Sequence, residues 1–424
     1  MAHCIYDITS PDGELFHTEN LAEFCKEWSL DPKGMSSETV DGSTYKGWKV
    51  ERIPKALTVQ NQMKKSGLSL DERVLRITDE NTKLKQELND AKRDSSIIKE
   101  VAEIIETIEP IKCIPPYKPL YNKSATIQES AILVLSDSHA DQQILSGRVQ
   151  GLEEYNFNVA CKRGERIVDV TTSHLLENMK NYSFKTLYVF GVGDYVSGEI
   201  HGAKEHSQWK NSIKNSMATG ELFAQMLAEL AQKFSKIVFI SVSGNHGRFS
   251  QKKDYRGAQE NWDYLVGMHV KTRLQSLIEN GSLDVVIPDA WSTVVNIEGW
   301  NFVLGHGDDI KSFSGLPFYG IERKTRRLMS VNAVNGIVPH YFVMGHFHQK
   351  TSLAHTMGEI FINGAWNATD EFALESLGAY TEPSQLLMGV HPKYGVSWRM
   401  PIRLRTDNWQ VEEKKKSRYN VDMF

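Results

Sequence analysis

Short apolar runs recur through the second half of the chain, and each ends at a Gly or Ser followed by polar residues. Five of them have the length and the β-branched or aromatic content of buried strands: residues 131–135, 187–192, 237–242, 302–304 and 341–344. Because the ends of adjacent strands in one sheet converge, we expect the polar side chains after these runs to meet at one edge.

The first 55 residues show a different pattern and predict a small module. Residues 20–29 read as an amphipathic helix, for which Thr18 is the expected N-cap, and residues 45–50 read as a turn and a short closing strand. The apolar face of this helix comprises Leu21, Phe24, Cys25 and Trp28.

Residues 56–110 predict a coiled-coil helix. Between residues 70 and 107, apolar residues from Val74 to Ile105 recur in steps of three and four, as in a heptad seam, with Asn81 at a core position. A Pro-containing linker at 111–130 separates this helix from the domain that holds the five strand-like runs. We therefore expect a homo-oligomer formed through the coiled coil, and the alternative is a single amphipathic helix packed on that domain.

The residues that come directly after the five strand-like runs are all metal-ligand types. Carboxylate and amide oxygens with imidazole nitrogens suit Mn, Fe or Zn, and a bridging carboxylate is how two-metal sites hold ions roughly 3.5–4 Å apart. We expect Asp194 to bridge two ions, of which Mn is the first choice and Fe or Zn the alternatives. The remaining ligands would be Asp137, His139 and His348 on one ion, and Asn245, His306 and His346 on the other.

In this order, the motifs Asp-x-His, Gly-Asp, Gly-Asn-His, His-Gly and Gly-His-x-His resemble those of the calcineurin-like metallophosphoesterase superfamily. The resemblance implies an α/β fold at 131–410, a two-layer β-sandwich flanked by helices, with a dinuclear metal centre. It also implies phosphoester hydrolysis, with His246 as a catalytic residue that holds no metal. Many members have Asp or Glu directly after Gly-Asn-His, whereas this chain has Gly247 and then Arg248. Arg248 is therefore a candidate phosphate contact.

The chemistry expected from these residues is attack of a metal-activated water on phosphorus. The metals would spread the developing charge, and His246 would protonate the leaving oxygen or stabilise its charge. His201, in the loop-like segment after Asp194, is a second candidate substrate contact, with a surface residue as the alternative. The chain lacks a Gly-x-x-x-x-Gly-Lys-Ser/Thr phosphate loop, which argues against a nucleotide motor.

DNA is the expected partner, and a DNA nuclease the expected activity. The 1–55 module resembles the helix-turn-helix-like modules of phage proteins and homing endonucleases, which implies DNA binding, although its 10 acidic and 6 basic residues favour a protein-interaction module equally. The alternative activity is that of a phosphatase or cyclic-nucleotide phosphodiesterase acting on a small substrate or phosphoprotein, and a DNA-tethered scaffold is a third. Two basic clusters could contact phosphates: Arg248, Lys252, Lys253 and Arg256, and Arg323, Lys324, Arg326 and Arg327.

The composition indicates the class of protein and its cellular compartment. The chain has 424 residues, 40% hydrophobic and 24% charged, with a net charge of −4, as is ordinary for a globular protein. Its four cysteines are widely spaced, which suits a reducing cytosol. No apolar run approaches the ~20 residues of a membrane span. We expect a cytoplasmic protein without membrane contact, in a bacterial host if phage-encoded, and a charged tail at 411–424 with residues 414–416 solvated.

Overall fold

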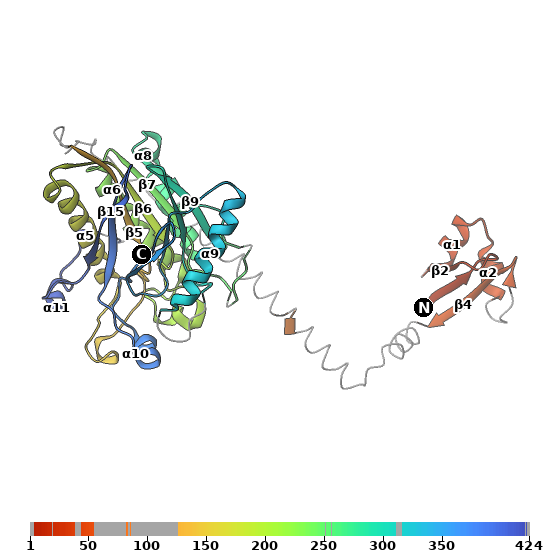
Figure 1. Ribbon diagram of the computed structural model, residues 1–424. Helices are drawn as coiled ribbons and strands as arrows, with labels where there is room; N and C mark the ends of the chain where they lie inside the picture. The colour runs from red at the N-terminus through yellow and green to blue at the C-terminus, as the bar shows by residue number, and fades with distance from the viewer. Residues whose placement is uncertain are drawn as a thin grey trace. The chain divides into compact units, whose positions relative to one another are not determined.

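The computed structural model describes residues 4–18, 20–38, 44–54, 82–83, 85, 126–250, 252–255, 257–310, 316–419 and 421 (Figure 1). Contacts divide the chain into two units, residues 1–99 and 100–424. Apart from positions 82, 83 and 85, the coiled-coil helix predicted within 56–110 lies outside the described residues, as do residues 111–125 of the predicted linker.

The N-terminal unit is a four-stranded antiparallel sheet with two short helices. The strand order is β2-β1-β4-β3, formed by β1 (Cys4–Thr9), β2 (Leu15–Thr18), β3 (Thr44–Tyr45) and β4 (Trp48–Pro54). The helices are α1 (Leu21–Glu27) and α2 (Pro32–Glu38). The turn between β3 and β4 places Lys46 and Gly47 at positive φ, as hairpin turns of two residues require. The predicted closing turn and strand are thus confirmed.

Helix α1 buries three of the four residues of the predicted apolar face, whereas Trp28 follows the helix and is exposed. Leu21, Phe24 and Cys25 are buried in a core with Ile8 and Met35. The predicted N-cap was wrong. Asn20 caps the helix by accepting a hydrogen bond from the Glu23 N–H, because its side chain stands three residues before that donor. Thr18 ends β2 instead, and its hydroxyl accepts the Asn20 N–H.

The second unit contains two sheets. The six-stranded sheet has the order β15-β14-β5-β6-β7-β8 and the five-stranded sheet the order β12-β13-β11-β10-β9. All five predicted runs lie in strands. The first sheet comprises β5 (Ile127–Leu135), β6 (Tyr182–Val192), β7 (Lys236–Val242), β8 (Leu283–Val286), β14 (Ser384–His391) and β15 (Gly395–Arg403). The second comprises β9 (Ser292–Ile297), β10 (Trp300–Gly305), β11 (Tyr341–Met344), β12 (Thr351–His355) and β13 (Gly358–Ile362).

The two sheets pack face to face around one apolar core. Val134, Phe190 and Ile240 from the six-stranded sheet share a buried cluster with Phe302 and Val343 from the five-stranded sheet. On the other face of the five-stranded sheet, Val303 of β10 and Phe342 of β11 cluster with Ile321, so these two strands are apolar on both faces. The predicted two-layer β-sandwich is therefore the observed architecture.

Helices cover the outer faces of the sandwich. Helices α5 (Phe157–Thr172), α6 (Ser212–Ala231) and α7 (Trp262–Arg273) contact strands of the six-stranded sheet, and α9 (Phe318–Val334) packs on the five-stranded sheet through Ile321 and Leu328 (Figure 1). The shorter helical elements are η1 (Ser146–Arg148), η2 (Ser173–Asn178), η3 (Ile200–His206), α8 (Gln275–Glu279), α10 (Glu371–Leu377) and α11 (Trp409–Glu412). Among the described residues, no helix is both long enough and apolar enough to span a membrane.

Strand register brings the motif loops to one edge. Strands β5, β6 and β7 run parallel and in line, as do β10 and β11 in the other sheet. His306 Nδ1, just after β10, lies 2.8 Å from the Val192 carbonyl at the end of β6, so the strands of both sheets end on the same side of the sandwich. The loops after these strands then bond directly to one another. Asp137 N donates to Gly193 O at 3.0 Å, and Gly345 N donates to His306 O at 3.0 Å.

The C-terminal segment packs on the sandwich. Glu413, Ser417 and Tyr419 are buried, and the fully buried Arg163 guanidinium donates to Glu413 and to Glu153. This differs from the separate charged tail predicted for 411–424, because the buried Arg163 requires carboxylate partners that the segment supplies. Lys414 and Lys415 themselves are exposed, as expected.

Candidate metal centre

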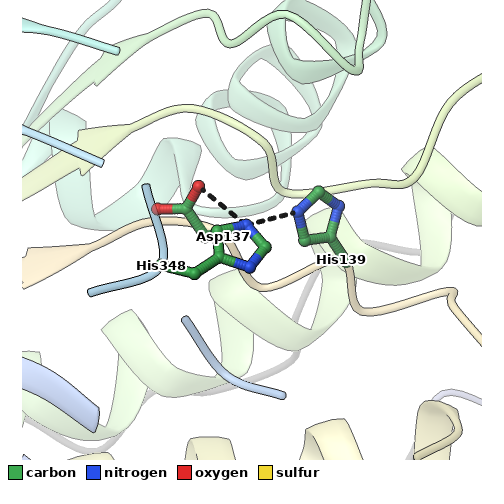
Figure 2. A group of neighbouring side chains, drawn as sticks. All are labelled: Asp137, His139 and His348. Atoms are coloured by element: carbon green, nitrogen blue, oxygen red, sulfur yellow. Dashed lines mark hydrogen bonds and ion pairs between the residues drawn. The ribbon is translucent and has the colours of Figure 1, made fainter. Parts of the chain in front are cut away.

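Asp137, His139 and His348 form one group of converging ligand atoms (Figure 2). The Nε2 atoms of His139 and His348 lie 3.4 Å apart, and His348 Nε2 is 3.5 Å from Asp137 Oδ1. The candidate ligand atoms of the group all lie within 4.8 Å of one another. Two ring nitrogens and a carboxylate that point at a common position are the arrangement a divalent cation requires.

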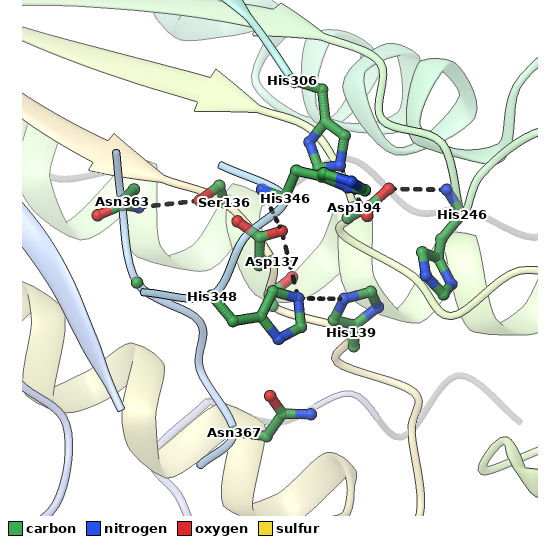
Figure 3. A network of polar contacts seen from close by, with 12 residues as sticks. Ser136, Asp137, His139, Asp194, His246, His306, His346, His348, Asn363 and Asn367 are labelled. Atoms are coloured by element: carbon green, nitrogen blue, oxygen red, sulfur yellow. Dashed lines mark hydrogen bonds and ion pairs between the residues drawn. The ribbon is translucent and has the colours of Figure 1, made fainter. Parts of the chain in front are cut away.

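A second group adjoins the first and comprises Asp194, His306 and His346. His306 Nε2 lies 2.8 Å from Asp194 Oδ2 and 3.0 Å from Asn245 Oδ1. Asp194 also forms a close group with His139 and His246, so its carboxylate lies between the two sets (Figure 3). The structure thus brings together all seven residues that the sequence suggested as ligands, in the two sets expected.

The backbone at these residues is strained in a consistent way. Among the described residues, ten non-glycine residues have positive φ, and five of the ten are Asp137, His139, Asp194, His346 and His348. Such conformations are uncommon outside glycine and persist where the surroundings enforce them, often at functional sites. Glycines next to the motifs make room, since a Cβ on Gly244 would meet Asp194 Oδ1 at 2.2 Å. These loops are built to present side chains rather than to minimise backbone strain.

Burial and charge prepare most of these groups to bind cations. Burial, aided by His246, lowers the pKa of His139 to about 3. Burial, aided by His306, lowers the pKa of His346 to about 4. Both imidazoles are therefore neutral at pH 7, the form that binds a metal. The buried Asp137 Oδ2 has no hydrogen-bond partner among the described residues, and a cation would satisfy it.

His306 is held differently. Burial opposes its charging, but the adjacent Asp194 outweighs that and raises the pKa of His306 to about 10. Its Nδ1 lies 2.8 Å from the Val192 carbonyl and donates to it, so Nε2 is the atom turned to Asp194. A proton and a divalent cation compete for Nε2 of His306. The possible ligand atoms around it are all nitrogen or oxygen. The residues of both groups therefore fit divalent ions of the Mn, Fe or Zn type.

His246 points at the same cluster from the edge. Its ring centroid lies 4.8 Å from that of His139, and its backbone N–H donates to Asp194 Oδ1 at 2.8 Å. Its Nδ1 lies 3.1 Å from the Ser197 carbonyl and donates to it, which directs Nε2 away from that carbonyl. The carboxylate missing after Gly-Asn-His is thus replaced as an orienting group by a backbone oxygen.

Ser197 is itself fixed by a buried acid. The Ser197 N–H donates to Asp141 Oδ1 at 2.7 Å, and burial raises the pKa of Asp141 to about 6. Neither Ser197 nor Asp141 was singled out in the sequence. Asp141 lies two residues after His139, so its place beside the Asp-x-His motif was the one available signal.

Asp263 is a second buried carboxylate that the motifs did not reveal. Its Oδ2 accepts the N–H groups of Asp194 and Gly244, both at 2.8 Å, and its Oδ1 accepts the Tyr195 N–H at 3.0 Å. Burial and the nearby charge of Asp194 raise its pKa to about 7. One side chain therefore ties the Gly-Asp loop to the Gly-Asn-His loop. An acid in the first turn of a helix is ordinarily explained by the helix dipole, so no sequence signal distinguished it.

We expect Asp263→Asn to weaken metal binding about 10- to 100-fold, the usual effect of losing an outer partner of a metal ligand. The amide would present N–H groups to backbone donors and so shift Asp194. Calorimetric titration of Mn²⁺ into metal-free protein measures this. Glu221→Gln is the matched control, because Glu221 is a buried carboxylate that accepts from Arg273 away from the cluster. Equal Mn²⁺ affinity in wild type and Asp263→Asn would contradict the role.

The two proposed substrate contacts fare differently. Arg248 Nη1 lies 3.7 Å from Asp308 Oδ2, and its buried Nε has no hydrogen-bond partner among the described residues. His201 lies in η3, but its side chain is outside the described part of the structure. Within the basic clusters, Lys253 bonds both oxygens of Asp308 at 2.8 Å, and Lys324 contacts Asp309. Asp308 and Asp309 come shortly after ligand His306, so the two basic clusters flank the same edge of the site.

No protein-family model and no curated protein matches the chain. Solved structures similar to it include Vps29 from Cryptosporidium parvum, at 13% identity over 62% of this chain and 86% of that chain, with a TM-score of 0.28. They also include an archaeal phosphodiesterase, which is 11% identical over 64% of this chain and 99% of that chain, with a TM-score of 0.31. A third is YfcE, a phosphoesterase from E. coli, which is 13% identical over 64% of this chain and 100% of that chain, with a TM-score of 0.28. At this level of similarity, the chemistry must be argued from the residues of the chain itself.

Proposed function

We propose that this protein is a metal-dependent phosphoesterase that uses two divalent ions, Mn²⁺ first among them. The observation that carries the proposal is the pair of adjoining ligand groups on either side of the Asp194 carboxylate. When bound, two such ions supply Lewis-acid chemistry to a phosphoryl group. Asp137, His139 and His348 would hold one ion, and Asn245, His306 and His346 the other.

The chain's own residues provide the rest of the reaction. The Ser197 carbonyl holds Nδ1–H of His246, so Nε2 is the atom that delivers a proton to the leaving oxygen. Asp263 and the strained loops fix the ligands before substrate arrives, which avoids the cost of reorganising them during the reaction. The site lies at a sheet edge, where loops rather than core residues decide which substrate enters.

Within this class we propose a nuclease that acts on DNA. The support is the basic residues near His306: Arg248 and Lys253 after the Gly-Asn-His motif, which pair with Asp308, and Lys324 on α9, which pairs with Asp309. Arg323 and Arg327 are on the same helix as Lys324. Cations near the centre would neutralise phosphates of a polyanion. The N-terminal unit would add DNA affinity through its exposed Lys33, Lys46 and Lys49, and the 56–110 segment would add oligomerisation.

We expect Arg248→Ala to reduce turnover of labelled DNA more than turnover of a small phosphodiester, because only DNA carries the neighbouring phosphates. DNA binding should also lose about one counterion from its salt dependence, the signature of one phosphate contact. Cleavage assays with Mn²⁺ measure the loss of turnover. Binding titrations over a range of salt concentrations with Mn²⁺ present measure the change in salt dependence.

Arg403→Ala is the matched control, since Arg403 is an exposed arginine paired with Glu382 at the end of β15. If the full chain neither binds nor cuts single- or double-stranded DNA at low salt, yet hydrolyses small esters, the nuclease proposal is wrong. A phosphatase or cyclic-nucleotide phosphodiesterase then becomes the better assignment.

A further inference from the structure

A pocket of about 180 Å³ shares a wall with the candidate metal centre. His306, Gly307 and Asp308 line one side of it, and His306 is also a proposed ligand. The rest of its lining comes from β10, β11 and α9, where Val303, Phe342 and Leu328 supply apolar surface. A group bound here would therefore lie beside a phosphoryl group at the metals.

Part of the pocket's lining is polar and aromatic. Lys253, Trp291 and Lys324 line the pocket together with Asp308 and Asp309. The Lys253 ammonium lies 4.3 Å from the centre of the Trp291 ring and bonds both oxygens of Asp308. Charged groups of both signs at an apolar recess suit a flat heteroaromatic ring that carries polar edge groups, rather than a hydrocarbon or a bare anion.

The volume is sufficient for such a ring. A cavity of about 150 Å³ lined by apolar side chains holds benzene, so about 180 Å³ accepts a six-membered ring with small substituents. The carboxylates of Asp308 and Asp309 can accept from N–H groups at the edge of a pyrimidine, and the ring can stack at Trp291.

We propose that this pocket binds the base of the nucleotide whose phosphoester lies at the metal centre. The inference rests on the proposed phosphodiester hydrolysis and adds to it a base-binding subsite. It gives the enzyme a means of positioning a nucleotide, because burial of the base orients the attached phosphate at the ions.

The test compares two diesters with the same leaving group, the p-nitrophenyl ester of thymidine 5′-phosphate and methyl p-nitrophenyl phosphate. Wild type should prefer the thymidine ester in kcat/KM. Leu328→Phe fills the recess from α9 and should lower that preference about tenfold, within the range that pocket contacts command. Trp291→Ala, which removes a half-buried lining residue rather than a core residue, should lower it as well.

Val331→Phe is the control, because it adds a ring at an exposed position of the same helix and should keep the wild-type preference. The subsite is overturned if wild type has no preference for the thymidine ester, or if both pocket variants keep it. If neither ester is cleaved with Mn²⁺, the proposed function fails first. Calorimetry with thymidine 5′-monophosphate then decides the subsite separately, since binding must occur and must weaken in both pocket variants.

Discussion

Asp194→Asn is expected to remove metal binding and hydrolysis together. Asp194 is the carboxylate that stands between the two ligand groups, with Oδ2 at 2.8 Å from His306 Nε2 and Oδ1 bound by the His246 N–H. An amide keeps the shape but supplies no negative charge to balance two divalent ions. Losing several kcal/mol of transition-state stabilisation by the metals would lower the rate of hydrolysis at least about 10³-fold.

Metal analysis of the purified variant and turnover of bis-p-nitrophenyl phosphate measure the two losses side by side. Asp284→Asn is the control, because Asp284 is an exposed carboxylate paired with Lys236 on the sheet edge far from the motif loops. A variant that keeps two ions and full turnover would show that Asp194 does not bridge them. One ion with full turnover would contradict the dinuclear proposal.

His246→Ala is expected to separate catalysis from metal binding. Its ring is oriented by the Ser197 carbonyl rather than by a second acid, and although it lies close to His139 and Asp194, we assign neither ion to it. The variant should keep both ions and lose at least about 10²-fold in kcat, the usual contribution of a general acid. The loss should be smaller for substrates whose leaving group needs no proton, such as p-nitrophenolate.

The comparison of leaving groups carries the test. A poor leaving group, such as an alkyl alcohol, should show the larger loss, since it must be protonated as it departs. His391→Ala makes the same truncation on a histidine that stacks on Tyr394 outside the cluster and should behave as wild type. Loss of an ion from His246→Ala would make His246 a ligand, and full activity would remove its role altogether.

Much of this arrangement could be predicted from the sequence because it depends on local signals. Each apolar run is long enough and β-branched enough to be a buried strand, and each ends at a Gly or Ser that permits a sharp turn. Parallel strands then bring the residues after them to one edge. The expected convergence was within one sheet, whereas Asp137 follows a strand of the six-stranded sheet and His348 a strand of the five-stranded sheet. These two residues, 211 positions apart in the chain (348 − 137), meet because the two sheets also pack face to face.

The parts that escaped prediction depend on tertiary partners. Asp263 accepts three backbone N–H groups from loops that lie far from it in sequence, and no spacing rule marks an acid for such a place. The docking of Glu413 depends likewise on Arg163, which is buried on α5. Thr18 was the expected cap of a helix that would begin at residue 20, whereas α1 begins at Leu21 and is capped by Asn20, a difference that depends on the exact start of the helix.

The most direct measurement of the central claim is a metal titration of the chelator-treated full chain, followed by hydrolysis of bis-p-nitrophenyl phosphate. Two ligand groups that share Asp194 predict no turnover without metal and a return of activity that saturates at two equivalents of Mn²⁺ per chain. Turnover that survives complete removal of metal, or none with Mn²⁺, Fe²⁺ or Zn²⁺, would contradict the assignment of this cluster as a dinuclear phosphoesterase centre.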